Sequence, residues 1–182
     1  MNPQGVKELT VLNCGDSRTL LIGEPMSPDS GSSTVVFETR DHSPDNEEEM
    51  ERLEKGKALG LDYSLPVCPM TSGSYIVVGD YQYAVVRSLE GSFVTSKGIV
   101  SDPDMAVLDL SRTFADSRPG ALVLACDGLF EVMSSEEVGR EVVRMRNENY
   151  MAGDIAKNLC GQALKRGSYD NISVVVVYLD AV

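Results

Sequence analysis

Ala121-Leu-Val-Leu-Ala-Cys126 is an uninterrupted apolar run that ends at an acid-glycine pair, Asp127-Gly128. Six apolar residues without alternation favour a strand that is covered on both faces. A glycine directly after the acid allows the chain to turn tightly. We therefore predict a buried strand that delivers Asp127 to the rim of a sheet.

A second acid, Asp170, stands just before another β-branched run, residues 172–178, which is typical of a strand. If the two strands pair antiparallel, the end of the first lies beside the start of the second, so Asp127 and Asp170 share one edge. Two such charges about 4 Å apart repel by roughly 4 kcal/mol at an effective dielectric of about 20, so we expect a cation between them. All-oxygen ligands favour Mg²⁺ or Mn²⁺.

These two segments resemble the C-terminal motifs of the type 2C, metal-dependent protein serine/threonine phosphatases. Residues 125–134 read A-C-D-G-L-F-E-V-M-S where the family has A-S-D-G-L-W-D-V-L-S, and residues 167–177 read G-S-Y-D-N-I-S-V-V-V-V where the family has G-S-x-D-N-I-T-V-V-V-V. The resemblance implies an α+β fold, an α-β-β-α sandwich of two mainly antiparallel sheets with outer helices. It also implies hydrolysis of phosphoserine and phosphothreonine in proteins, with two Mg²⁺ or Mn²⁺ ions in the complete site.

The resemblance assigns roles to five residues. Asp127 and Asp170 occupy metal-ligand positions, Gly128 lets the backbone come close, and Asn171 orients the turn of the second strand. Glu131 stands where the family usually has an aspartate that serves a further, weaker metal. No catalytic residue is implied beyond the metal ligands. The alternative is that both acids belong to ordinary turns, since Asp-Gly and Asp-Asn are common turn formers.

The resemblance covers residues 1–182 as a single, partial domain that corresponds to the C-terminal portion of the family domain, so the N-terminal part of the fold is missing. A complete member also carries an arginine for the substrate phosphate, a Glu-Asp pair and a D-G-H-G-G motif. None of these is found here, where Asp127-Gly128 is the only Asp-Gly pair. We therefore expect this chain to be inactive or weak alone. The alternative is a pseudophosphatase or protein-interaction module without catalysis. The only histidine, His42, is expected to be structural.

The composition of the chain limits the classes of binding partner that we expect. The formal net charge of −12 argues against nucleic acid, because no basic stripe exists to contact a phosphate backbone. Four cysteines without C-x-x-C spacing indicate buried free thiols in a reducing compartment. No signal segment or membrane-spanning run is found, so we expect no membrane partner and a cytoplasmic or nuclear location. A phosphoprotein is the expected substrate, and unpaired strand edges are expected to cause self-association.

In the first third of the chain, the pattern predicts a hairpin of strands 8–13 and 18–22 and a strand at 34–38. It then predicts an acidic helix within 45–59, which begins with a capping box of Asp45 and Glu48, and a hairpin around Gly79-Asp80 with its second strand at 83–86. The rest of the chain is predicted to form a strand at 106–110 and two helices, one from Ser134 and one over 154–165. The two helices would form a crossover on one face of a sheet.

Overall fold

The computed structural model describes residues 7–26, 34–58, 60, 75–89, 92–95, 97–115 and 117–179. The chain forms two compact units. The first, called the sheet unit here, contains residues 1–11, 17–39 and 105–182, and the second, the α1 unit, contains residues 12–16 and 40–104. The expectation of one domain over residues 1–182 stays a prediction.

The sheet unit is built on a four-stranded antiparallel sheet in the order β3-β2-β7-β8. Its strands are β3 (Val35–Glu38), β2 (Arg18–Pro25), β7 (Ser117–Ala125) and β8 (Val174–Tyr178). The antiparallel pairing expected between the two acid-bearing strands is confirmed, with Ala125 opposite Val174. The end of β7 therefore lies beside the start of β8.

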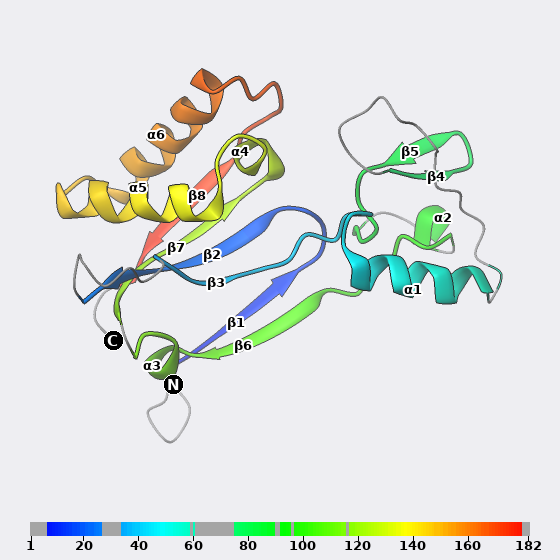
Figure 1. The fold of residues 1–182 in the computed structure, drawn as a ribbon, viewed down its shortest axis with the longest axis horizontal. Helices are drawn as coiled ribbons and strands as arrows, with labels where there is room; N and C mark the ends of the chain where they lie inside the picture. The colour runs from blue at the N-terminus through cyan, green and yellow to red at the C-terminus, as the bar shows by residue number, and fades with distance from the viewer. Residues whose placement is uncertain are drawn as a thin grey trace. The chain divides into compact units, whose positions relative to one another are not determined.

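Two helices, α5 (Ser135–Asn147) and α6 (Ala152–Lys165), cover one face of this sheet (Figure 1). Their apolar sides pack with alternate strand residues in one buried cluster, which includes Val123, Val138, Val142, Ile155, Leu159 and Val176. Helix α5 begins at the predicted place, with Ser134 and Glu137 in a capping box. Gly167, at φ 90°, follows the C-cap Arg166 of α6 in the left-handed conformation that favours glycine. The crossover expected from the sequence is confirmed.

Two further strands, β1 (Glu8–Asn13) and β6 (Asp104–Asp109), pair with each other in a two-stranded sheet. The predicted hairpin of residues 8–13 with 18–22 is therefore wrong, because β2 pairs with β3 and β7. Leu20, Leu21 and Ile22 are all fully buried. Both edges of β2 are occupied, one by β3 and the other by β7, so β1 has no free edge of β2 to pair with.

The prediction that the 121–126 strand is covered on both faces is also wrong. Leu124 is 40% exposed, and its cross-strand partner Val175 is 55% exposed. Both lie on the face opposite the helices, because Val123 and Ala125 alternate with Leu124 and face the helical side. The described residues leave this part of β7 and β8 uncovered. A short helix, α3 (Leu110–Thr113), links β6 to the segment that precedes β7.

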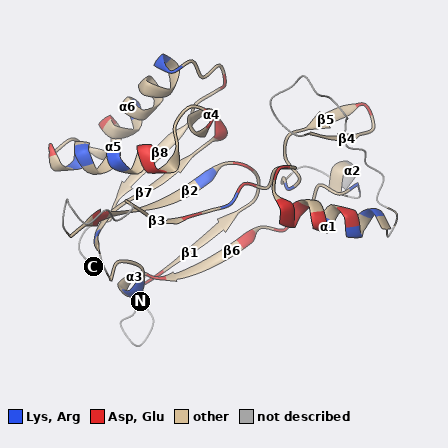
Figure 2. Cartoon of the chain, viewed as in Figure 1, with Lys and Arg blue, Asp and Glu red and all other residues tan. Residues whose placement is uncertain are grey.

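The α1 unit contains α1 (Glu47–Ala58), the antiparallel pair β4 (Ile76–Val78) and β5 (Tyr81–Tyr83), and α2 (Ser92–Thr95). The predicted hairpin around Gly79 is confirmed, although its second strand begins two residues before the expected position. Helix α1 has glutamates in its first turn and lysines in its last (Figure 2), as the helix dipole favours. Its N-terminal cap is Asn46, whose Oδ1 accepts from the Glu48 N–H at 3.0 Å, and not the expected Asp45.

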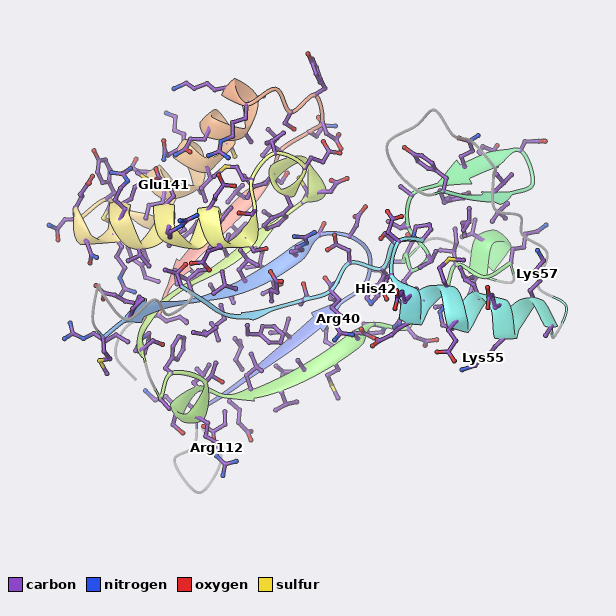
Figure 3. The ribbon with its side chains drawn as sticks, viewed as in Figure 1. Arg40, His42, Lys55, Lys57, Arg112 and Glu141 are labelled. Carbon is purple, nitrogen blue, oxygen red and sulfur yellow. The ribbon has the colours of Figure 1, made fainter. Side chains whose placement is uncertain are left out.

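His42 lies at the start of this unit with 1% of its surface exposed (Figure 3). Its Nδ1 accepts a hydrogen bond from the Gly15 N–H at 3.1 Å, so the ring proton resides on Nε2. Nε2 is 3.2 Å from Asp104 Oδ2, without the alignment of a hydrogen bond. The Val86 N–H donates to the His42 carbonyl. These contacts tie three segments of the α1 unit together.

The cysteines are less buried than expected. Cys14, Cys126 and Cys160 are free thiols and half-buried, and burial raises the pKa of Cys14 and Cys160. Cys68 lies outside the described residues. No helix in the described part of the chain is long and apolar enough to cross a lipid bilayer.

Candidate metal centre

Three carboxylates gather at the edge of the sheet where β7 ends and β8 begins. Asp127 opens the short helix α4 (Asp127–Phe130), and Glu131 follows one helical turn later. Asp170 lies in the segment between α6 and β8. One carboxylate oxygen from each residue lies within 4.8 Å of the others. Asp127 and Asp170 are 43 positions apart in the sequence. The fold brings them to one edge of the sheet, as the predicted antiparallel pairing of their strands requires.

The pairing of β7 with β8 continues past the ends of both strands. The Cys126 N–H donates to the Ser173 carbonyl at 3.2 Å. The Cys126 Sγ lies 3.1 Å from the Asn171 carbonyl and 3.2 Å from the Ser173 nitrogen, which donates to it. These contacts hold the segment that carries Asp170 against the residue that precedes Asp127.

Gly128 permits the close approach of the two segments. A Cβ added at this position would lie 2.6 Å from the Asn171 carbonyl oxygen and 3.3 Å from the Asp170 Cβ. A contact of 2.6 Å with a backbone oxygen would force the segments apart. The geometry thus gives a physical reason for the glycine that the resemblance singled out.

Asn171 contributes through its backbone. Its N–H donates to Asp170 Oδ1 at 2.7 Å, and its carbonyl faces Gly128 and Cys126. Asp127 has a matching arrangement, since its Oδ1 accepts from the Gly128 N–H at 2.9 Å. Both acids are therefore oriented by the amide that follows them in the chain.

Sequence reasoning did not single out Ser168 or Cys126. Ser168 is buried and its hydroxyl donates to the Gly128 carbonyl at 2.7 Å, 40 residues away. Residues of this kind near turns follow no periodic pattern. Their place inside the two family motifs is the only sequence signal that could have identified them.

The donor set suits a hard divalent cation. In the described part of the chain no salt bridge joins Asp127, Glu131 or Asp170 to a basic side chain. Three exposed or half-exposed carboxylates close together repel one another unless a cation lies between them. Carboxylate oxygens with room for water are ligands that Mg²⁺ and Mn²⁺ accept. The residues present therefore fit such an ion.

An open depression of about 570 Å³ lies elsewhere on the sheet unit, lined by residues 35–38, Arg18 and the start of α5, Ser134 to Glu136. None of the three acids lines it. We place the candidate site at the acid cluster because three carboxylate oxygens converge there, in the two segments that the sequence singled out.

Comparison with known proteins gives a consistent picture. A family model described as "Protein phosphatase 2C" matches residues 2–172. Among curated relatives, "Protein phosphatase 1B" of Bos taurus is 33% identical over 178 residues, which are 94% of this chain and 31% of the relative. "Probable protein phosphatase 2C 69" of Arabidopsis thaliana is 34% identical over 169 residues, 93% of this chain and 40% of the relative. The chain thus spans about a third of the length of such relatives.

Solved structures show the same fold. A serine-threonine phosphatase 2C from Toxoplasma gondii superposes with a TM-score of 0.71 at 23% identity, over 94% of this chain and 54% of that one. A C. elegans sex determining protein superposes with a TM-score of 0.67 at 24% identity, over 96% of this chain and 37% of that one. The mixed α/β class with antiparallel sheets that the sequence predicted is confirmed.

Proposed function

Because this chain belongs to the protein phosphatase 2C family, we propose that it contributes to metal-dependent hydrolysis of phosphoserine and phosphothreonine in proteins, with Asp127, Asp170 and Glu131 as metal ligands. The observation that carries the proposal is the convergence of these carboxylates, which lie within the two family motifs. Ligand positions on strand ends suit such a site because the rigid sheet fixes them.

The reaction consumes one water: its oxygen adds to phosphorus, the bond from phosphorus to the serine or threonine oxygen breaks, and one proton of the water ends on that leaving oxygen. Asp127, Asp170 and Glu131 would hold Mg²⁺ or Mn²⁺, which would supply positive charge near the phosphate oxygens and lower the pKa of a nearby water molecule. The chain's own part is to hold ligands in place. The Gly128 and Asn171 N–H groups orient the Asp127 and Asp170 carboxylates, and the exposed position of Asp170 and Glu131 leaves the site open to a protein substrate.

We propose further that the chain is inactive or weak alone, because this sequence supplies the three carboxylates of the cluster without the D-G-H-G-G motif of complete members. Two or three carboxylates hold one Mg²⁺ with several waters, whereas the family reaction uses two ions. The alternative is a pseudophosphatase or interaction module that binds without catalysis.

The test is phosphate release from p-nitrophenyl phosphate and from a phosphothreonine peptide, with Mn²⁺ and purified protein. We expect little or no turnover, and any turnover should be lost in Asp127→Asn and in Asp170→Asn. Asp154→Asn, at an exposed position in α6, is the matched control. Turnover at a rate typical of enzymes, about 1 per second or more, would contradict weak activity. Turnover unchanged by Asp127→Asn would contradict the assignment of the site.

The partners follow from the same proposal. The substrate is a phosphoprotein, and neither nucleic acid nor membrane is expected as a partner of a chain with a net charge of −12. A cytoplasmic or nuclear location and self-association through unpaired strands and the uncovered part of the sheet belong to the proposal as well.

A further inference from the structure

We infer that Ser168 is a positioning residue for the metal centre, and this inference rests on the proposed function. Ser168 lies directly after Gly167, which ends α6, and two residues before Asp170. Its side chain is buried, with 7% of the residue surface exposed. Its hydroxyl donates to the carbonyl of Gly128 at 2.7 Å. The bond thus joins the segment of one acid to the helical turn of the other.

The Gly128 carbonyl depends on this donor. In the last turn of α4, the Glu131 N–H donates to Asp127, and the N–H groups of Val132 and Met133 both donate to Leu129. Among the described residues, these bonds leave the Gly128 carbonyl to the Ser168 hydroxyl. A buried carbonyl without a donor is costly. Loss of the hydroxyl would therefore strain the turn that carries Asp127 and Glu131.

A second contact on the α6 side comes from Arg166, whose Nη1 donates to the Val132 carbonyl at 3.1 Å, and further contacts between the two segments lie on the β8 side. Cys126 contacts Asn171 and Ser173, beyond Asp170 in the chain. Ser168 is the hydroxyl contact on the α6 side, before Asp170. The segment that carries Asp170 is therefore held at both ends, and removal of the Ser168 bond would take away the buried contact at the end nearer α6.

The distance between Asp127 and Asp170 depends on this two-ended hold. Residues that orient metal ligands without touching the metal typically change metal affinity about 10–100-fold when they are replaced. We expect the same range here. Ser168 touches neither substrate nor reacting atoms in this role, so its effect should appear in metal affinity and not only in turnover.

The experiment is a Mn²⁺ titration of the purified chain by calorimetry, checked by the loss of the free Mn²⁺ signal in electron paramagnetic resonance. Ser168→Ala should raise the Mn²⁺ Kd about tenfold or more. Ser117→Ala is the matched control, because Ser117 is also buried, and its hydroxyl has no hydrogen-bond partner in the described structure. Ser117 begins β7, at the end of the strand away from Asp127, so the Ser117→Ala chain should bind Mn²⁺ with the wild-type Kd.

A second pair of variants separates the hydroxyl from the fold. The threonine and valine side chains have nearly the same shape, but only threonine keeps the hydroxyl. The Ser168→Thr chain should therefore bind Mn²⁺ about tenfold more tightly than the Ser168→Val chain. Circular dichroism melts in EDTA report whether each variant folds without metal. A Kd within twofold of wild type for Ser168→Ala, or equal Kd values for folded Thr and Val variants, would overturn the inference. If the wild-type chain binds no Mn²⁺, the result would instead contradict the proposed metal centre itself.

Discussion

Glu49 and Arg87, 38 residues apart, form a buried ion pair in the α1 unit, in which Arg87 Nε donates to Glu49 Oε1 at 2.9 Å. The Glu49 side chain is only 3% exposed. Arg52 donates to its other oxygen at 3.0 Å, and Arg87 also contacts Asp104. Burial raises the pKa of Glu49, but the hydrogen bonds from Arg87 and Arg52 outweigh burial and leave that pKa lowered.

Arg87→Met should destabilise the chain by about 3–5 kcal/mol, because removing one partner of a buried pair leaves a buried charge partly uncompensated. Urea unfolding monitored by circular dichroism measures the change. Arg40→Met is the control, because the Arg40–Glu48 pair has side chains 68% and 73% exposed, and exposed pairs contribute about 0–1 kcal/mol. Equal effects of the two substitutions would contradict the structural role of Arg87.

Protonation of Glu137 should lower the stability of the folded chain at acid pH, below the ordinary pKa of a glutamate. The Ser134 N–H, followed by Arg166, lowers the pKa of Glu137 from 4.5 to about 2. A group with a depressed folded pKa contributes stability that is fully present above its unfolded pKa and is lost as the pH falls through its folded pKa. The contribution is therefore complete above about pH 4.5 and disappears on approach to about pH 2.

Glu137→Gln should flatten the loss of stability between those two pH values, which a series of urea midpoints would show. Glu54→Gln is the control, because Glu54 is exposed on α1 and its side chain has no hydrogen bond among the described residues. If the Glu137→Gln chain loses stability between pH 4.5 and pH 2 as steeply as the wild type, the capping interaction does not operate in solution.

The sequence predicted the acid pair because strand type and antiparallel pairing together determine which strand ends meet. Asp127 ends one apolar run and Asp170 precedes another, so local pattern was sufficient. The same reasoning failed for β1. Two short apolar runs joined by a turn-like link can pair with each other or enter different sheets, and the outcome was decided by β3 and β7, which occupy both edges of β2.

Side-chain contacts between distant segments were not predictable. The hydrogen bond of Ser168 follows from a carbonyl left without a backbone donor in α4, which is a property of the folded turn. The bridge between α5 and α6 is similar, because Glu141 accepts from Asn158 and Gln162 of the other helix at 2.7 Å (Figure 3). Each of these residues is an ordinary polar residue in its local sequence.

Gly128→Ala should weaken Mn²⁺ binding about 10–100-fold, because its Cβ would push against the Asn171 carbonyl, only 2.6 Å away, and separate the two acids. Calorimetric titration with Mn²⁺ measures the effect. Gly161→Ala is the matched control, since Gly161 lies inside α6 and no atom lies within 4 Å of its added Cβ. That control should stabilise the chain by about 0.5–1 kcal/mol and leave the Mn²⁺ Kd unchanged. Unaltered binding by Gly128→Ala would show that the close approach is unnecessary.

Self-association should depend on the uncovered part of the sheet. Leu124 and Val175 are directly opposed on β7 and β8 and are 40% and 55% exposed, and Val177 on the same face of β8 is 45% exposed. Exposed apolar faces and strand edges favour association between copies. We expect the wild-type chain to sediment as a dimer or larger species, and Val175→Lys to shift it toward the monomer, because a lysine on this face would have to be desolvated in the interface.

Leu164→Lys is the control, because Leu164 is 62% exposed on α6 and the helix separates it from that face of the sheet. It should leave the sedimentation coefficient unchanged. Both substitutions replace exposed residues, so the melting temperatures of the two variants should stay close to the wild-type value. A wild-type chain that sediments as a sharp monomeric boundary with a cooperative melt would show that the uncovered face remains soluble without a partner, and self-association would have to be abandoned.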